Sequence, residues 1–233
     1  MRNLSIVAVA AISLAACAGE STPDAAKPAD SAVATAAPSS AEPMTSVFSN
    51  EYAVASVVTL APGQVLPAHT GGPRAVYALS DYTIRFTQDG QTSEPTWKAG
   101  QAHFHAAGEH SIENIGTTEA KFLVVARTAQ ALASAPAHGE SPSSGATPPL
   151  LDNDDVRVSE VRLAAGDTLP RHPGLARVVY ALSDYTISYT ANSTEAAVNT
   201  FTAGQAHWHD ADEHLIVNTG ATEARFLIVQ FKR

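Results

Sequence analysis

The sequence predicts an all-β protein in which the same fold occurs twice. An internal repeat matches "LPAHTGGPRAVYALSDYTIRFT" at residues 66–87 with "LPRHPGLARVVYALSDYTISYT" at residues 169–190. In each copy, segments rich in Val, Ile, Thr, Tyr and Phe alternate with turn-forming stretches such as "APGQ" and "NIGTTE". No run of ten or more residues combines helical periodicity with capping residues. Short strands at this spacing predict a β-sandwich or β-barrel in each copy.

The first seventeen residues have the composition of a secretion signal that ends in a cysteine. Arg2 precedes an apolar stretch from Leu4 to Ala16 that is too short to span a membrane. The ending Leu14-Ala15-Ala16-Cys17 resembles the lipobox of bacterial lipoproteins, and an ordinary secretory signal is the alternative. The resemblance implies that residues 1–16 are removed and that Cys17, the only cysteine, is lipidated. Because alanine and not aspartate follows Cys17, it also implies anchoring on the periplasmic side of the envelope, with the outer membrane favoured.

Composition divides the rest of the chain into two domains and two connecting segments. Residues 17–46 are rich in Ala, Pro, Ser and acidic residues without apolar periodicity, which predicts a lipidated, disordered tether. The expected domains are residues 47–128 and 151–233, joined by a linker at residues 129–150. His138 lies in this linker, has no counterpart in the repeat, and is expected to be solvated.

The net charge is also informative about partners. The formal charge is −9, and it becomes −10 without residues 1–16, whose only charged side chain is Arg2. An acidic body argues against nucleic-acid binding, and the expected membrane contact is through the lipid alone.

Each copy carries glycine and histidine residues at the spacing of two known motifs. Gly63 and His69 fit the start of the first motif, as do Gly166 and His172. The second motif is followed, one residue short, by Gly100, Gly108, His110 and Asn114, and by Gly204, His214 and Asn218, with Asp212 in place of the inner glycine. The chain therefore resembles a two-domain member of the cupin superfamily, a bicupin. This resemblance implies two tandem cupin-type jelly-roll β-barrels.

The same positions depart from the metal-binding pattern of the family in both copies. The resemblance implies a metal held by two histidines and a glutamate of the first motif with the histidine of the second. Here Gly71 and Gly174 replace the second histidine, and Arg74 and Arg177 replace the glutamate. Two imidazoles rarely hold a metal tightly, and a guanidinium beside them repels a cation. We therefore expect no firmly bound cofactor, although a divalent metal remains open.

Two further histidines in each copy could complete a site. His103 and His105 share one face of a predicted strand and Phe104 lies on the other, as His207 and His209 do around Trp208. We expect the histidines to face inward, the alternative being that they face outward, with the pair exposed and Phe104 packed inside. A divalent metal would then be held by His69, His105 and His110, and by His172, His209 and His214. Pairing of Arg74 with Asp81 or Asp184 is an alternative that would leave the arginine purely structural. Glu109 and Glu213 are expected to be exposed, the alternatives being that they orient an imidazole or act as a fourth ligand.

Three functions remain open from the sequence. The first is binding of a small, anionic ligand such as a carboxylate, strengthening as the histidines protonate near pH 6. Its ligand-binding residues would be His69, Arg74, His103, His105, His110, His172, Arg177, His207, His209 and His214. The second is a metal-dependent enzyme of the dioxygenase or isomerase type, which the missing ligands disfavour. The third is a structural envelope lipoprotein whose barrels are filled by their own side chains. Cupins often pair edge to edge, so a homo-oligomer is possible, but the two copies could also pair within one chain.

Overall fold

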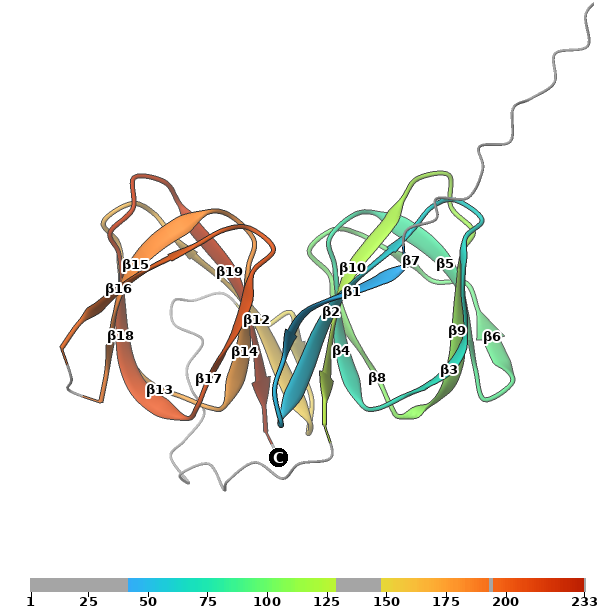
Figure 1. Ribbon diagram of the computed structural model, residues 1–233, viewed down its shortest axis with the longest axis horizontal. Helices are drawn as coiled ribbons and strands as arrows, with labels where there is room; N and C mark the ends of the chain where they lie inside the picture. The colour runs from blue at the N-terminus through green and yellow to red at the C-terminus, as the bar shows by residue number, and fades with distance from the viewer. Residues whose placement is uncertain (1–41, 129–147, 193–194, 233) are drawn as a thin grey trace, which may run out of the picture. The chain divides into compact units, whose positions relative to one another are not determined.

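The computed structural model describes residues 42–128, 148–192 and 195–232, and within these ranges it contains strands and no helix. The predicted fold class, all-β with two tandem jelly-roll barrels, is confirmed (Figure 1). No helix in the described ranges is long and apolar enough to cross a membrane. The predicted signal peptide, Cys17, residues 18–41 of the tether and His138 lie outside the described residues.

The first barrel consists of two antiparallel sheets that face each other across an apolar interior. One sheet has five strands in the order β1 (Met44–Ser49), β2 (Ala53–Leu60), β10 (Ala120–Arg127), β4 (Arg74–Ala78) and β8 (Ala102–His105). The other contains β3 (Val65–Gly71), β9 (Gly108–Asn114), β5 (Tyr82–Gln88) and β6 (Gln91–Ser93), with β7 (Thr96–Trp97) also paired to β5.

The second barrel repeats this arrangement, with the single strand β16 in place of β6 and β7. Its first sheet runs in the order β11 (Leu151–Asp152), β12 (Val156–Leu163), β19 (Ala224–Phe231), β14 (Arg177–Ala181) and β17 (Ala206–His209). Its second sheet runs in the order β13 (Thr168–Gly174), β18 (Asp212–Asn218), β15 (Tyr185–Ala191) and β16 (Ala197–Phe201). In both barrels the strand register shifts just before the first-motif histidine, between Leu66 and His69 and between Leu169 and His172.

The first barrel begins earlier than the composition of the chain indicates. Strand β1 starts at Met44, inside the segment predicted as tether, because residues 44–46 pair with the backbone of β2. The tether prediction is therefore wrong for these three residues. Backbone pairing is largely independent of side-chain composition, so a Met-Thr-Ser edge strand gives little sequence signal.

Strand alternation divides the apolar residues between the barrel interiors and a layer that both barrels share. Along β4, Arg74, Val76 and Ala78 face the interior of the first barrel, whereas Ala75 and Tyr77 belong to the shared layer. That layer combines buried residues of β2, β4 and β10 with those of β12, β14 and β19. Phe104 and Trp208 pack against it. Within the chain, the two barrels pack through the outer faces of their five-stranded sheets.

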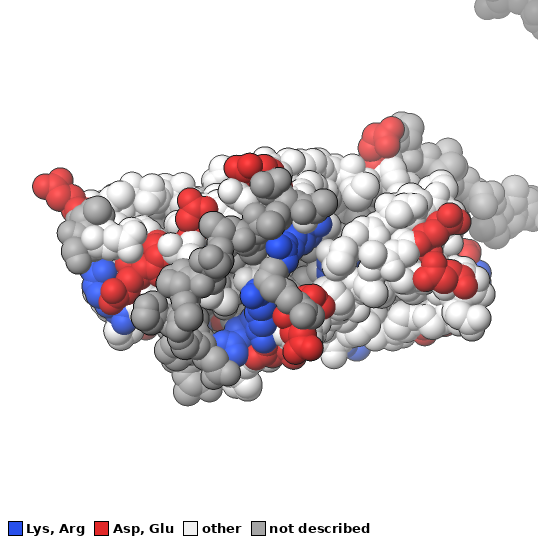
Figure 2. Space-filling model, turned by 90° about the horizontal axis from the view of Figure 1, so that it is seen from below, with Lys and Arg blue, Asp and Glu red and all other residues white. Residues whose placement is uncertain are grey.

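Charged side chains on the described surface are mixed in sign. On the face drawn in Figure 2, the basic and acidic side chains of the described residues are interspersed, without a broad basic area. Among the described residues, several charged side chains form pairs, such as Lys98 with Asp81 at 2.9 Å and Arg85 with Glu94 at 3.0 Å.

Candidate functional site

The motif histidines of each barrel are neighbours in space. His69 and His110 are register partners on β3 and β9, with ring centroids 4.2 Å apart, and the equivalent rings of His172 and His214 are 4.3 Å apart. Nδ1 of His69 lies 2.8 Å from the carbonyl oxygen of Pro67, which can only accept a hydrogen bond. The proton of neutral His69 therefore resides on Nδ1, and Nε2 keeps a free lone pair.

The histidine pair on β8 lies on the inner face of the first barrel, as the alternation of the strand requires. His105 lines the interior cavity, and its ring centroid lies 4.4 Å from that of Phe86. His103 lies apart from this cavity and stacks on Trp97 at 3.8 Å with an interplanar angle of 9°. In the second barrel His209 is beside Tyr189 at 4.9 Å, and His207 stacks on Phe201 at 4.3 Å. One histidine of each pair therefore reaches the site, and the other supports it.

Arg74 is a buried cation that is only partly hydrogen-bonded. Its residue exposure is 6%. Nη1 donates to the carbonyl oxygens of Gly72 at 3.0 Å and Ala106 at 3.3 Å. Nη2 is buried and has no hydrogen-bond partner in the described residues. A Cβ atom on Gly71 would lie 2.9 Å from Nη1 of Arg74 and 2.7 Å from Cε1 of His110, so glycine is required where the guanidinium lies.

The predicted alternative partners of Arg74 are engaged elsewhere. Asp81 accepts hydrogen bonds from Nζ of Lys98 and the backbone N–H of Ala99, each at 2.9 Å. Asp184 accepts one from the backbone N–H of Ala203 at 2.8 Å. Within the described ranges no carboxylate forms a salt bridge with Arg74. The interpretation of Arg74 as one half of a structural ion pair with Asp81 or Asp184 is therefore wrong.

Arg74 faces a cavity of about 260 Å³ inside the first barrel. The polar part of the cavity wall is formed mainly by Arg74 with His69, His105 and His110. Most of the remaining wall is apolar and includes Leu66, Ile84, Phe86, Ile112, Phe122 and Val124. The cavity thus has a cationic, imidazole-lined region and an apolar region, a division that suits an amphiphilic small molecule.

Arg177, the equivalent arginine of the second barrel, has equivalent partners for Nη1 but different partners for Nη2. Nη1 of Arg177 donates to the carbonyl oxygens of Leu175 at 2.9 Å and Asp210 at 3.4 Å, the counterparts of Gly72 and Ala106. Its Nη2 donates to Oδ1 of Asp212 at 3.0 Å and to Oη of Tyr189 at 2.9 Å. The guanidinium of the second barrel is therefore paired within the chain.

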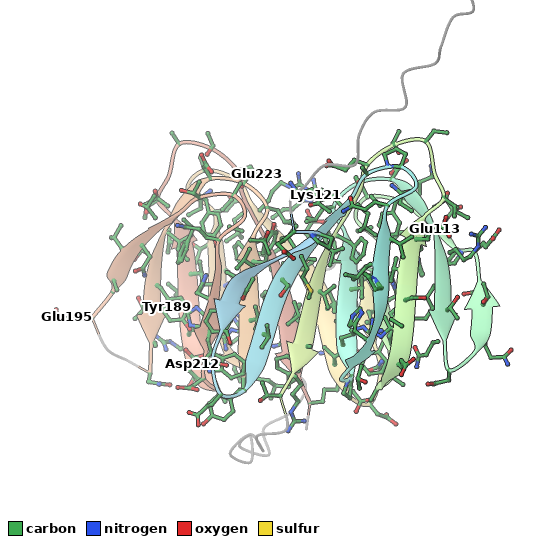
Figure 3. All side chains as sticks on the ribbon, turned by 45° about the vertical axis from the view of Figure 1, so that its right-hand side comes forward. Glu113, Lys121, Tyr189, Glu195, Asp212 and Glu223 are labelled. Carbon is green, nitrogen blue, oxygen red and sulfur yellow. The ribbon has the colours of Figure 1, made fainter. Side chains whose placement is uncertain are left out.

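Asp212 is the centre of this network. Besides Arg177, it accepts a hydrogen bond from Nδ1 of His214 at 3.0 Å and one from the hydroxyl of Tyr189. Asp212 and Tyr189 come from the neighbouring strands β18 and β15 and are labelled in Figure 3. Gly108 and Phe86 occupy the equivalent positions of the first barrel, which therefore lacks both the carboxylate and the hydroxyl.

Burial and the arginines set the ionisation of both sites. Burial, reinforced by the charge of Arg74, lowers the pKa of His105 and of His110 to about 4. Burial raises the pKa of Asp212, but the bond from His214, the charge of Arg177 and the bond from Tyr189 together hold it well below its usual range. At neutral pH the second site thus holds a balanced ion pair, and the first holds an unbalanced guanidinium. The expectation of histidine protonation near pH 6 is wrong for His105 and His110, because the sequence does not show their burial.

The residues of neither site fit a divalent metal. His69, His105 and His110 line the same cavity, but the guanidinium of Arg74 faces that space too and repels a cation. In the second barrel the carboxylate of Asp212 is bound to Arg177. Among the described residues there is no group of three or more His, Cys, Asp or Glu side chains placed to hold a metal ion. Glu109 and Glu213 are exposed.

Tyr189 was not identified as a site residue from the sequence, and Asp212 was noted only as a departure from a motif. The signal was available in the comparison of the two copies, where Phe86 matches Tyr189 and Gly108 matches Asp212. Its meaning depends on the fold, because only strand pairing brings residues 189 and 212 onto the same guanidinium.

Solved structures share this two-barrel architecture at low sequence identity. AerE from Microcystis aeruginosa aligns with a TM-score of 0.59 and 12% identity, over 81% of this chain and 96% of its own. An oxalate decarboxylase from Bacillus subtilis, an enzyme with Mn(II) centres, aligns with a TM-score of 0.56 and 16% identity, over 78% of this chain and 69% of its own. No protein-family model and no curated protein sequence matches the chain. These likenesses show the fold alone.

Proposed function

We propose that this protein, which has the two-barrel cupin fold, binds one small carboxylate with an apolar body in the cavity of its first barrel. The observation that carries the proposal is the Nη2 atom of Arg74, which is buried, charged and without a partner in the described residues. Leaving a buried cationic donor unsatisfied is costly, so a ligand that satisfies it gains that energy on binding.

A carboxylate is the ligand group that this environment favours. Guanidinium groups pair with carboxylates through charge-assisted hydrogen bonds, which are stronger in a site shielded from water. Nη1 of Arg74 is already held by two carbonyl oxygens, so Nη2 is the atom available to the ligand. With one uncompensated positive charge in the cavity, a monoanion restores neutrality, whereas a dianion would leave a buried negative charge.

The size and lining of the cavity restrict the rest of the ligand. An apolar cavity of about 150 Å³ accommodates one benzene molecule. By that measure the 260 Å³ cavity holds roughly ten non-hydrogen atoms. Ligands such as benzoate or hexanoate match this size and place carbon against the side chains of Leu66, Ile112 and Phe122. Such a cavity also argues against the alternative of a purely structural first barrel filled by its own side chains.

The proposed location is the periplasmic side of the cell envelope. It is supported by the lipobox-like sequence ending in Cys17 and by the tether that follows it. The barrels would thus stay near the membrane that holds the lipid, where they would meet small carboxylates that have entered the periplasm.

The proposal is tested by calorimetric titration of the mature protein with benzoate and hexanoate at pH 7. A ligand of about ten atoms that satisfies a buried cation should bind with a Kd between about 10 µM and 1 mM. Benzamide, which has the shape of benzoate without its charge, should bind at least tenfold more weakly. Phthalate, which adds a second carboxylate, should also bind more weakly.

Arg74→Gln should abolish binding of both carboxylates. The matched control is Arg85→Gln, because the Arg85 side chain is 44% exposed on the same barrel and is paired with Glu94 and Glu113. This control should bind benzoate as the unmodified protein does. Absence of binding of benzoate and hexanoate to the unmodified protein would refute the proposal, as would equal binding by the Arg74→Gln variant.

A further inference from the structure

We propose that Asp212 is a built-in carboxylate ligand of the second barrel. It neutralises the buried guanidinium of Arg177 permanently, whereas that of Arg74 in the first barrel is neutralised only when a free carboxylate binds. The two arginines have equivalent Nη1 partners, at 2.9 and 3.4 Å in the second barrel and 3.0 and 3.3 Å in the first. Their Nη2 atoms are therefore in equivalent positions. One of them is bound to a carboxylate and a phenol, and the other is without a partner in the described part of the first barrel.

Other substitutions between the copies also favour a filled second barrel. Five cavity-lining residues of the first barrel have larger counterparts in the second, namely Val54 with Arg157, Gly72 with Leu175, Phe86 with Tyr189, Val124 with Ile228, and Ala126 with Gln230. Gln230 is buried and is the register partner of Arg177, as Ala126 is of Arg74. These exchanges place side-chain atoms of the second barrel where the first barrel has space.

The position of Asp212 also indicates where a ligand carboxylate would lie in the first barrel. By equivalence it would lie beside Gly108, within reach of Nη2 of Arg74 and Nδ1 of His110. Nδ1 of His110 has only a long contact of 3.3 Å to the carbonyl oxygen of Gly108, whereas Nδ1 of His214 donates to Asp212 at 3.0 Å. Together with the proposed function, on which this step rests, the inference predicts one carboxylate bound per chain and not two.

The first test removes the built-in ligand and supplies it again in solution. Asp212→Gly leaves space for the lost –CH₂COO⁻ group, and acetate is that group with one added hydrogen. The experiment is carried out in the Arg74→Gln background, so that acetate cannot act through the first barrel. Breaking a buried ion pair should lower the Tm of this double variant by about 6–12 °C relative to Arg74→Gln alone.

Sodium acetate at about 100 mM should recover a substantial part of this loss, because a ligand that binds only the folded state raises its stability. Sodium chloride at the same ionic strength and acetamide should not. Acetate should change the Tm of the Arg74→Gln parent, which keeps Asp212, by less than about 1 °C. A double variant as stable as its parent, or one on which acetate acts no better than chloride, would overturn the inference without bearing on the first barrel.

The second test transplants the built-in ligand into the first barrel, and it also covers the case in which Asp212→Gly does not fold. Phe86→Tyr, Gln88→Ala, Asp89→Asn and Gly108→Asp together reproduce Tyr189, Ala191, Asn192 and Asp212 of the second copy. Gln88→Ala and Asp89→Asn are included because a Cβ atom on Gly108 would lie 2.7 Å from Nε2 of Gln88 and 2.9 Å from Oδ2 of Asp89. The control carries Gly108→Asn with the same three companions, so that only the charge of residue 108 differs.

The Asp transplant should have a ligand-free Tm at least about 5 °C above the Asn control, since only the carboxylate balances Arg74. Equal Tm values would contradict the inference whether or not the first barrel binds benzoate. A benzoate stoichiometry of two per unmodified chain would also overturn it while leaving the proposed function intact. A stoichiometry of zero would instead remove the proposed function and leave the two Tm tests valid.

Discussion

The Nη2 atom of Arg177 lies 3.0 Å from Oδ1 of Asp212, and the two side chains are only 3% and 10% exposed. The corresponding atom of Arg74 has no such partner in the described residues of the first barrel. Two barrels with equivalent strands and registers therefore carry the same cation in opposite electrostatic states. This difference makes the consequence of an identical substitution opposite in the two copies.

Replacing each arginine with methionine should show this asymmetry directly. Arg177→Met leaves Asp212 buried without its cation, which should cost about 3 kcal/mol in the free energy of unfolding. Arg74→Met removes an uncompensated charge and fills its space with apolar atoms, so its effect should lie within about 1 kcal/mol of zero or be stabilising. Urea denaturation at pH 7 without added carboxylate measures both values.

The control for the arginine comparison is Arg85→Met, at an exposed position of the first barrel. Its effect should be about 0.5 kcal/mol or less, because exposed ion pairs contribute little. If Arg74→Met were as destabilising as Arg177→Met, the first barrel would have to hold a partner for Arg74, and the cavity would not be the site of an unbalanced charge.

Stability should fall as the pH decreases from 7 to 4. The pKa of His103 and His209 is lowered to about 3, and that of His105, His110 and His207 to about 4, chiefly by burial. In the unfolded chain histidine titrates near pH 6.5. Between the lowered pKa values of the folded state and this value, the unfolded state therefore binds protons that the folded state does not. Stability is then highest above pH 6.5 and decreases toward pH 4. Each histidine should contribute on the order of 1 kcal/mol, so the Tm should fall by about 10 °C or more between pH 7.5 and pH 4.5.

Removal of one such histidine from each barrel checks the cause of the acid sensitivity. His103 and His207 stack on Trp97 and Phe201, and Nδ1 of each is buried without a hydrogen-bond partner in the described residues. Phenylalanine can therefore replace both rings. The double variant should show a smaller decrease in Tm over the same pH range, and an unchanged decrease would assign the sensitivity to other groups.

Much of the fold could be predicted from the sequence because its signals are local. Turn residues separate strands of alternating character, and the repeat identifies two copies of one domain. The start of β1 at Met44 could not be predicted in this way, because an edge strand is held by backbone pairing with β2. The docking of Phe104 and Trp208 on the shared apolar layer likewise depends on residues far apart in the sequence.

The candidate site was predictable in its residue types but not in its pairing. The sequence contains His69, Arg74 and His110 at motif positions, and strand alternation places His105 with them. It does not show that Arg177 contacts Asp212, which is 35 residues away in the sequence. Nor does it show that burial lowers the pKa of His105 to about 4. Both facts follow from the barrel interior, which excludes water and brings β14, β15 and β18 together.

Lipidation of Cys17 should be detectable by metabolic labelling with palmitate in a bacterial host. The thiol of Cys17 is the attachment point that the lipobox-like sequence implies, and the chain has no other cysteine. Labelled palmitate should therefore enter the unmodified protein and be absent from Cys17→Ala. Equal labelling of the two would contradict anchoring through this residue. Fractionation should place the unmodified protein with the outer membrane.

The two barrels should unfold together because they share one apolar layer. Leu123 and Leu227 are equivalent residues of this layer and are at most 1% exposed. Leu123→Asp would bury an unpaired carboxylate there and remove a large apolar contact, at a cost of about 3–5 kcal/mol.

Trp97 in the first barrel and Trp208 in the second allow the unfolding of each barrel to be followed by fluorescence, in variants whose other tryptophan is replaced by Phe. In the parent background both fluorescence signals should change at one Tm. With Leu123→Asp the Trp97 transition should move down by about 10 °C or more and separate from that of Trp208. Lys121→Asp, an exposed substitution on the same strand β10 (Figure 3), should leave the transitions coincident. Separate transitions in the parent would show that the shared layer does not couple the barrels.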